Sequence, residues 1–237
     1  MRGDAEPVRL VVAVRLAGID PLPSEPVMRA RASSAWYTPP DAAAVVARMA
    51  YSAALRRPEV AGVEPWRILE PAAGHGALID ALVGELAPSR ETIVDAVELD
   101  SHAAVVLADK ALSWPCRARV HLDDYLERPA PARPYDLAVM NPPYEGGLDS
   151  LFLRKAMDES LRVVALVRLA LLESQRSYER VWSRLDGEWR LIELRPFVQR
   201  PVFAAPSSRA CGGKTAFCAL KLSRVRGERG TVVGFVR

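Results

Sequence analysis

Short apolar runs alternate along the chain with longer stretches in which apolar side chains recur every three or four positions. The short runs predict buried β-strands, and the longer amphipathic stretches predict helices. We expect strands at residues 8–16, 66–71, 92–100, 118–124, 135–141, 163–169, 188–198, 215–223 and 231–236. We expect helices at residues 41–56, 72–86, 101–112, 148–161 and 177–185, the second of which opens with a glycine turn.

Strands that alternate with helices favour a mainly parallel sheet with helices on both faces. The pattern therefore predicts an α/β fold of the doubly wound kind, and the strand-rich end of the chain predicts an antiparallel hairpin. A length of 237 residues fits one such domain. We expect residues 1–35 to form an N-terminal extension and residues 36–237 to form one domain, in which residues 195–237 make a basic edge hairpin and its loops.

Composition excludes several classes of protein. No apolar run approaches the roughly 18 residues that a membrane span needs, and charged residues interrupt the apolar run near the N-terminus, unlike in a signal peptide. We therefore expect a cytoplasmic protein without a membrane partner. The spacing of Cys116, Cys211 and Cys218 matches neither a disulfide framework nor a zinc site, so we expect no metal.

Charge is distributed unevenly along the chain. The formal net charge is +3, but the last 77 residues hold 15 Arg and Lys against 6 Asp and Glu, a balance of +9. The first 160 residues then carry about −6. This asymmetry favours a C-terminal part that faces a polyanion such as a nucleic acid.

The turn "LEPAAGHGAL" places Gly74 and Gly76 between a predicted strand and a helix, where backbone can approach a ligand closely. The full GxGxxG pattern is absent, since Ile79 stands at the third glycine position, which argues against a dinucleotide. Glu98 ends the next strand, where a carboxylate can accept the hydroxyls of a ribose. Asp124 ends the strand after it and could accept an exocyclic amine. The pattern predicts a site for a cofactor that contains a nucleoside.

The segment "VMNPPYEG" interrupts the chain directly after another predicted strand. Asn141 offers an amide oxygen, and Pro142 and Pro143 restrict the backbone so that the Pro142 carbonyl is fixed in direction. Two acceptors beside the flat ring of Tyr144 suit a planar ring that carries an NH2 group, because the amine can be hydrogen-bonded while the ring is stacked.

These motifs together resemble those of the S-adenosylmethionine-dependent amino-methyltransferases, and more narrowly the DNA adenine-N6 methyltransferases with the gamma-type order of motifs. The resemblance extends over about residues 36–169 and rests on "WYTPP", "LEPAAGHG", "VELD", "DDYL" and "NPPY". It implies a Rossmann-like class I methyltransferase fold with a seven-stranded sheet, and S-adenosylmethionine as cofactor.

The same resemblance implies roles for individual residues. The cofactor-binding residues would be Tyr37, Thr38, Pro39, Glu70, Ala72, Gly74, Gly76, Glu98, Leu99, Asp124, Tyr125 and Asn141. In this set Tyr125 would pack on the adenine ring of the cofactor, and Leu99 would contact the same ring. The catalytic residues would be Asn141, Pro142, Pro143 and Tyr144, with the methyl group passing directly to the exocyclic N6 of an adenine flipped out of the duplex.

Substrate contacts would come from Tyr144 and from the C-terminal part of the chain. Members of the family supply a second aromatic ring to sandwich the base, and Phe203 is the candidate here. Arg200, Arg209 and Lys214 are the candidate basic contacts to nucleic acid. Since no separate target-recognition domain fits after the motifs, recognition could also come from a separate specificity subunit or a homodimer.

The same motifs are also compatible with other substrates and functions. We expect DNA rather than RNA as the substrate because of the forms "YTPP" and "EPAAGHG". NPPY also occurs in enzymes that methylate RNA adenine or guanine and in those that methylate a protein glutamine at N5. A non-catalytic cofactor-binding subunit of a methyltransferase complex is a further alternative.

Overall fold

The computed structural model describes residues 11–14, 37–54, 65–85, 92–203, 215–225, 231–234 and 236. The strands are β1 (Val11–Val14), β2 (Trp66–Glu70), β3 (Thr92–Glu98), β4 (Arg117–Leu122), β5 (Leu137–Met140), β6 (Arg162–Arg168), β7 (Arg190–Pro196), β8 (Phe217–Ser223) and β9 (Val232–Val233). The helices are α2 (Pro40–Ala54), α3 (Ala77–Glu85), α4 (Ser101–Ala111), α5 (Leu148–Glu159) and α6 (Gln175–Arg180). Short 3-10 helices are η1 (Tyr125–Glu127), η2 (Glu145–Gly147), η3 (Leu169–Leu172) and η4 (Trp182–Asp186).

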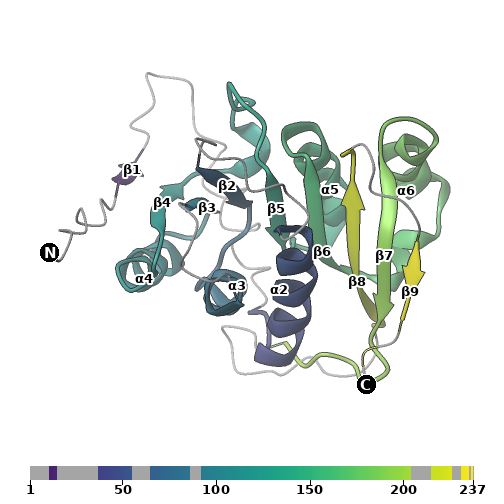
Figure 1. Ribbon diagram of the computed structural model, residues 1–237, viewed down its shortest axis with the longest axis horizontal. Helices are drawn as coiled ribbons and strands as arrows, with labels where there is room; N and C mark the ends of the chain where they lie inside the picture. The colour runs from purple at the N-terminus through teal and green to yellow at the C-terminus, as the bar shows by residue number, and fades with distance from the viewer. Residues whose placement is uncertain are drawn as a thin grey trace, which may run out of the picture.

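Within these residues one sheet holds nine strands in the order β1-β4-β3-β2-β5-β6-β8-β7-β9 (Figure 1). The strands from β1 to β6 in this order are parallel, and β8 runs antiparallel to both β6 and β7. The mainly parallel α/β sheet with antiparallel C-terminal strands is confirmed. The strand order reverses between β2 and β5, which is the position where open α/β sheets bind their ligands.

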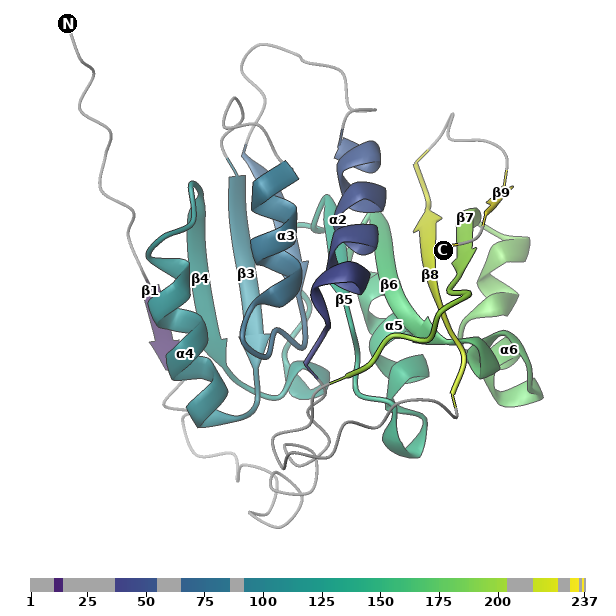
Figure 2. The same ribbon diagram turned by 90° about the horizontal axis from the view of Figure 1, so that it is seen from below.

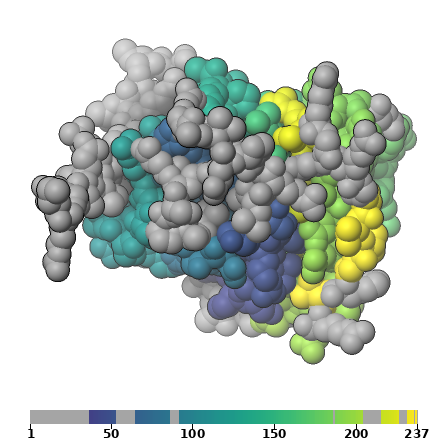
Figure 3. Space-filling model, in the orientation of Figure 1, coloured from purple at the N-terminus to yellow at the C-terminus, as the bar shows by residue number. Residues whose placement is uncertain are grey.

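The strand count of seven was wrong for this sheet, because an additional strand pairs at each edge. β1 lies in the expected N-terminal extension and pairs in parallel with β4, with Val11 opposite Arg119. β9 pairs in parallel with β7 at the other edge, and its two valines are exposed. The C-terminal strands reach the surface on the face drawn in Figure 3. The antiparallel strand β8 lies between β6 and β7 rather than outermost.

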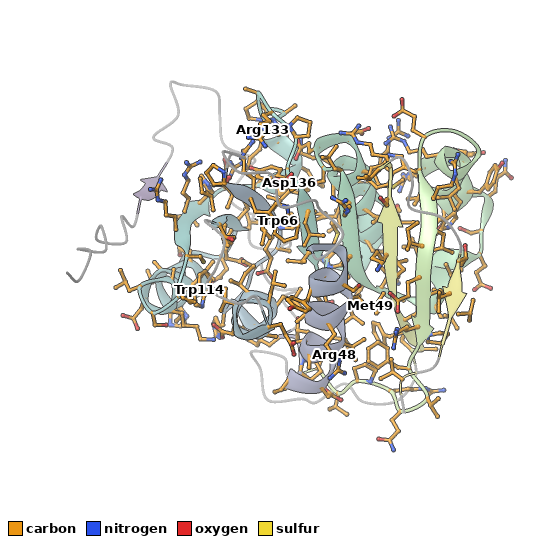
Figure 4. All side chains as sticks on the ribbon, viewed as in Figure 1. Arg48, Met49, Trp66, Trp114, Arg133 and Asp136 are labelled. Atoms are coloured by element: carbon orange, nitrogen blue, oxygen red, sulfur yellow. The ribbon has the colours of Figure 1, made fainter. Side chains whose placement is uncertain are left out.

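Two hydrophobic cores lie on opposite faces of the sheet. Helices α2, α3 and α4 cover one face, and α5 and α6 lie on the other (Figure 2). Side-chain alternation along the strands separates the cores, so Ile68 packs on the α2 face while Leu69 packs on the α5 face. Met49, Trp66 and Trp114 are buried in the first core (Figure 4).

Local sequence explains where several elements begin and end. Helix α2 starts at Pro40, with Asp41 in its first turn, and the Pro39 carbonyl accepts a hydrogen bond from Ala43 N at 2.9 Å. The Asp100 side chain caps α4 by accepting from Ala103 N at 2.7 Å. The helix expected at 177–185 is instead divided at Val181 into α6 and η4.

No helix in the described part of the chain has both the length and the apolar character of a membrane span.

Candidate functional site

Four polar side chains named from the sequence lie where neighbouring parallel strands end. Glu70 ends β2, Glu98 ends β3, Asp124 follows β4 and Asn141 follows β5. Because these strands are parallel and adjacent, their carboxyl ends form one edge of the sheet. All four side chains are buried or nearly so, and this edge is the candidate site.

The glycine turn after β2 is tied to β3 by the Glu98 carboxylate. Glu98 Oε2 accepts from Gly74 N at 2.7 Å, while Oε1 accepts from Leu99 N at 2.9 Å and from Asp100 N at 2.8 Å. Burial raises the pKa of Glu98, and the backbone hydrogen bonds from Asp100, Gly74 and Leu99 oppose that rise. Glu98 therefore shapes the turn, and its contacts with described residues use three of the roughly four lone-pair positions of a carboxylate.

Gly76 serves packing in this turn. Its φ is +77°, and a Cβ there would lie 2.9 Å from Cδ1 of Leu107 and 3.0 Å from the Trp114 ring. A larger residue would therefore be both strained and crowded. The sequence assigned Gly76 to the cofactor, but the structure shows a buried backbone packed against α4 and the turn that follows it.

Glu70 is a buried carboxylate at the end of β2. It is 2% exposed, and within the described residues its Oε2 has no hydrogen-bond donor. Burial raises its pKa well above the ordinary value, and the nearby Glu98 and Asp80 carboxylates add to the rise. A buried acid of this kind is stabilised by a cation placed beside it. The α-ammonium group of an amino acid is such a cation, so the site fits the methionine part of S-adenosylmethionine.

Residues before α2 meet the end of β5. Thr38 Oγ1 accepts a hydrogen bond from Asn141 Nδ2 at 2.9 Å. The Tyr37 ring stacks on His75 of the glycine turn, with ring centroids 4.1 Å apart and planes at 28°. Three segments far apart in sequence, around Tyr37, His75 and Asn141, thus converge as the motif pattern implied.

The side chain of Tyr144 in the NPPY turn is held by contacts with other parts of the protein. The Tyr144 hydroxyl donates to Asn141 Oδ1 and lies 3.3 Å from the Leu166 carbonyl. The ring packs at 5.3 Å from Phe217 and 6.2 Å from Phe203, measured between centroids. Tyr144 and Phe203 are therefore neighbours, and their role in sandwiching a base stays a prediction. Both rings are buried, so a base could stack between them only after they separate.

The structure does not bring every expected residue to this edge. Tyr125 was expected to pack on the cofactor ring, but it is buried in the α5 core, where its hydroxyl donates to Glu159 Oε2 at 3.1 Å and its ring contacts Phe152. The ring fills the core between η1 and α5, and its packing on the cofactor stays a prediction. Asp124 caps η1 by accepting from Leu126 N at 3.0 Å. Arg200 is exposed, while Arg209 and Lys214 lie outside the described residues.

The structure contains an ion pair beside the NPPY turn that the sequence did not predict. Asp149 Oδ2 accepts from Nε and Nη2 of Arg168 at 3.0 and 2.6 Å, and the Arg168 guanidinium lies 5.6 Å from the Tyr144 ring centroid. The pair joins the end of β6 to the first turn of α5. Within the described residues, no group of three or more His, Cys, Asp or Glu side chains could hold a metal ion.

No protein-family model matches the chain. Over 112 residues the chain is 35% identical to the tRNA1(Val) (adenine(37)-N6)-methyltransferase of Aeromonas hydrophila, a region that is 40% of this chain and 47% of that protein. Relatives from Aeromonas salmonicida, Klebsiella pneumoniae and Citrobacter koseri carry the same name. The chain spans about half the length of the first two of these curated relatives.

Solved structures show the same fold. The methyltransferase subunit of a type I restriction-modification system from Streptococcus thermophilus matches with a TM-score of 0.61 and 14% identity, over 86% of this chain and 48% of that chain. The 23S rRNA methyltransferase ErmE matches with a TM-score of 0.51 and 22% identity, over 77% of this chain and 68% of that chain. The chain therefore has the Rossmann-like fold of the class I methyltransferases.

Proposed function

We propose that this protein transfers the methyl group of S-adenosylmethionine to the exocyclic N6 of an adenine in RNA. The observation that carries the proposal is the Asn141 amide, which Thr38 orients at the carboxyl end of β5 beside Tyr144. The named tRNA adenine-N6 methyltransferases among the relatives support the same reaction.

Residues of the β2 and β3 ends would hold the cofactor. The Glu70 carboxylate would pair with the α-ammonium group, because it is buried and its Oε2 lacks a donor among the described residues. Glu98 would accept a ribose hydroxyl, and Leu99, Ala72 and Gly74 would border the cofactor along the turn. When bound, S-adenosylmethionine supplies an electrophilic methyl group on a sulfonium centre.

Asn141 would prepare the target nitrogen for reaction. Its Nδ2 donates to Thr38, so Oδ1 is the atom that faces Tyr144 and can accept one N–H of the adenine amine. The Pro142 carbonyl, whose direction the two prolines restrict, would accept the other. Both acceptors draw the nitrogen lone pair out of conjugation with the ring. A new N–C bond then forms as the C–S bond breaks, and the nitrogen loses a proton to water.

The aromatic residues would receive the base after a rearrangement. Tyr144 and Phe203 lie edge to face, with centroids 6.2 Å apart, and both are buried. Stacking a base on Tyr144 requires Phe203 and the segment that carries it to move aside. The Tyr144 hydroxyl must also yield or share Asn141 Oδ1, which has two lone pairs.

RNA is favoured over the DNA substrate that the motif forms suggested, because the curated relatives are tRNA methyltransferases. The DNA expectation is not confirmed, and it remains the competing arm of the test. A partner subunit or a second copy that supplies specificity also remains a prediction. One structural neighbour is a subunit of a type I modification system.

Two measurements test the proposal in sequence. Calorimetry with S-adenosylmethionine should show binding, and methyl-labelled cofactor should then transfer its label to unmodified tRNA and not to duplex DNA of matched adenine content. Asn141→Ala is the matched control, which should bind cofactor and transfer nothing. Label in DNA would instead support DNA as the substrate. Label in protein would favour a glutamine target, and binding without transfer to any acceptor would favour a non-catalytic subunit.

A further inference from the structure

Two arginines flank the loop that follows NPPY. Arg168 ends β6, the strand beside β5, and reaches Asp149 in the first turn of α5. Arg180 ends α6, and its Nη1 donates to Ser150 Oγ at 3.0 Å. Because Asp149 and Ser150 are adjacent, the two guanidinium groups lie beside the same turn of α5, only a few residues after Tyr144.

Two glycines without side chains lie in the loop next to the Arg180 guanidinium group. Gly146 and Gly147 have φ values of +59° and +78°, and a Cβ on Gly147 would lie 3.5 Å from Arg180 Nη1. A Cβ on Gly146 would meet nothing within 4 Å. A pair of glycines in this conformation lets another backbone approach closely. The acidic side chain on the loop is Glu145, which is exposed.

The two arginines keep hydrogen-bonding capacity. Arg168 uses Nε and Nη2 on Asp149, and its side chain is 33% exposed. A guanidinium offers five N–H donors, and among the described residues no hydrogen bond engages those of Nη1. Arg180 donates to a neutral hydroxyl, so that contact does not neutralise its charge. Glu179 is adjacent to Arg180 in sequence, and its Oε1 accepts from Gln175 at 2.8 Å.

From this geometry we propose that Arg168 and Arg180 bind phosphate groups of the RNA strand next to the adenine that Tyr144 receives. The inference rests on the proposed function and adds where the strand lies. Guanidinium groups bind phosphates in a planar, charge-assisted arrangement. The guanidinium of Arg168 is 5.6 Å from the Tyr144 ring centroid, so a nucleotide stacked on that ring has its own phosphate within reach of this side of the site.

The test measures RNA binding as a function of salt with S-adenosylhomocysteine-saturated protein and two fluorescein-labelled probes. One probe is unmodified tRNA and the other is an oligouridine, which has phosphates but no adenine. The logarithm of affinity falls linearly with the logarithm of salt concentration, by about 0.7 per phosphate contact on single strands. Arg180→Gln should therefore reduce the slope by about 0.7 on both probes, and should raise KM for tRNA with little change in kcat.

Arg168 needs a variant that preserves folding. Arg168→Gln leaves Asp149 buried and unpaired, so the double variant Arg168→Gln with Asp149→Asn is used, since it keeps the net charge of the wild type. It should reduce the slope as Arg180→Gln does. Arg190→Gln is the control for charge alone. Arg190 starts β7 and pairs in register with Ser223 of β8, and Ser223 also pairs with Arg162 at the start of β6. Arg190 therefore lies at the opposite end of the sheet from Arg168, which ends β6. Its slope should match that of the wild type.

The outcomes are decisive in both directions. Unchanged slopes for Arg180→Gln and for the double variant would overturn the inference, as would an equal loss for Arg190→Gln. If the wild type methylates tRNA while the slopes stay unchanged, this inference fails and the proposed function stands. If the wild type binds neither probe but binds cofactor, the RNA substrate itself is wrong.

Discussion

Thr38 Oγ1 accepts a hydrogen bond from Asn141 Nδ2 at 2.9 Å, joining two residues that are 103 positions apart in the sequence. Because the amide nitrogen is engaged by Thr38, the amide oxygen faces Tyr144. A residue just before α2 thus sets which atom of Asn141 is presented at the end of β5. The Thr38 hydroxyl should be needed for turnover even though it need not touch the adenine.

Replacing Thr38 by Val should test this orientation. Val keeps the shape of the side chain but leaves Asn141 Nδ2 without its acceptor, which should cost about 1–3 kcal/mol of stability. Misorientation of the amide should lower kcat by about 10- to 100-fold. Steady-state kinetics and urea unfolding measure the two effects. Thr38→Ser retains the hydroxyl and should retain most activity, and an equally inactive Ser variant would argue against an orienting role.

Tyr144 should separate the role of a ring from that of a hydroxyl. Tyr144→Phe keeps the stacking surface and removes the donor to Asn141 Oδ1, so turnover should persist and KM for RNA should fall. Tyr144→Ala removes the ring, which should cost about 3–5 kcal/mol of stability and abolish turnover, while cofactor affinity stays close to that of the wild type. A large loss of cofactor affinity in Tyr144→Ala would place this ring in the cofactor site instead.

Glu70 should make stability depend on pH. Burial and the neighbouring acids Glu98 and Asp80 raise its pKa, so the folded protein keeps a proton that the unfolded chain loses near the ordinary value of 4.5. This contribution to stability is fully present below pH 4.5 and is lost as pH rises through the raised pKa. Glu70→Gln should therefore melt at a higher temperature than the wild type at pH 8, and the difference should vanish near pH 4.

The same residue should couple cofactor binding to protons. An ammonium group beside Glu70 favours the ionised carboxylate, so binding should release protons from the wild type. Calorimetry in buffers of different ionisation enthalpy counts those protons. Glu70→Gln should release fewer and bind S-adenosylhomocysteine more weakly, whereas equal affinity and equal proton release would remove Glu70 from the cofactor site.

Gly76 should be a structural position and not a ligand contact. Gly76→Ala would put a side chain in a left-handed backbone conformation against Leu107 and Trp114, so we expect a loss of about 2–5 kcal/mol of stability. Gly84→Ala in α3 is the control, since a Cβ there meets nothing within 4 Å and Ala favours helix. Urea unfolding should show the loss for residue 76 and a small gain for residue 84, and similar stabilities would contradict the packing argument.

Much of the candidate site follows from sequence because it depends on strand ends. Glu98, Asp124 and Asn141 each follow an apolar run, and parallel strands bring their carboxyl ends to one edge. Glu70 was named through the family resemblance, and it ends β2 at the same edge. The arrangement at that edge therefore needed no knowledge of tertiary contacts. Family resemblance suggested Phe203 as a ring that sandwiches the base, and the structure places Phe203 beside Tyr144 without testing that role.

Other features depend on contacts that periodicity does not encode. Tyr125 belongs to a short 3-10 turn, where sequence does not indicate which way the ring points, and it points into the α5 core. The Arg168–Asp149 pair joins residues 19 positions apart on different elements. The position of β8 between β6 and β7 depends on spatial order, which the order of strands along the chain leaves open.

The most direct test of the account is to identify the nucleoside that receives the methyl group. Unmodified tRNA is incubated with the protein and methyl-labelled S-adenosylmethionine, digested to nucleosides and analysed by mass spectrometry. The acceptor geometry of Asn141 and Pro142 predicts N6-methyladenosine, formed by the wild type and lost in Asn141→Ala. A label on cytosine C5 or on a ring nitrogen, or the same product from Asn141→Ala, would contradict the account.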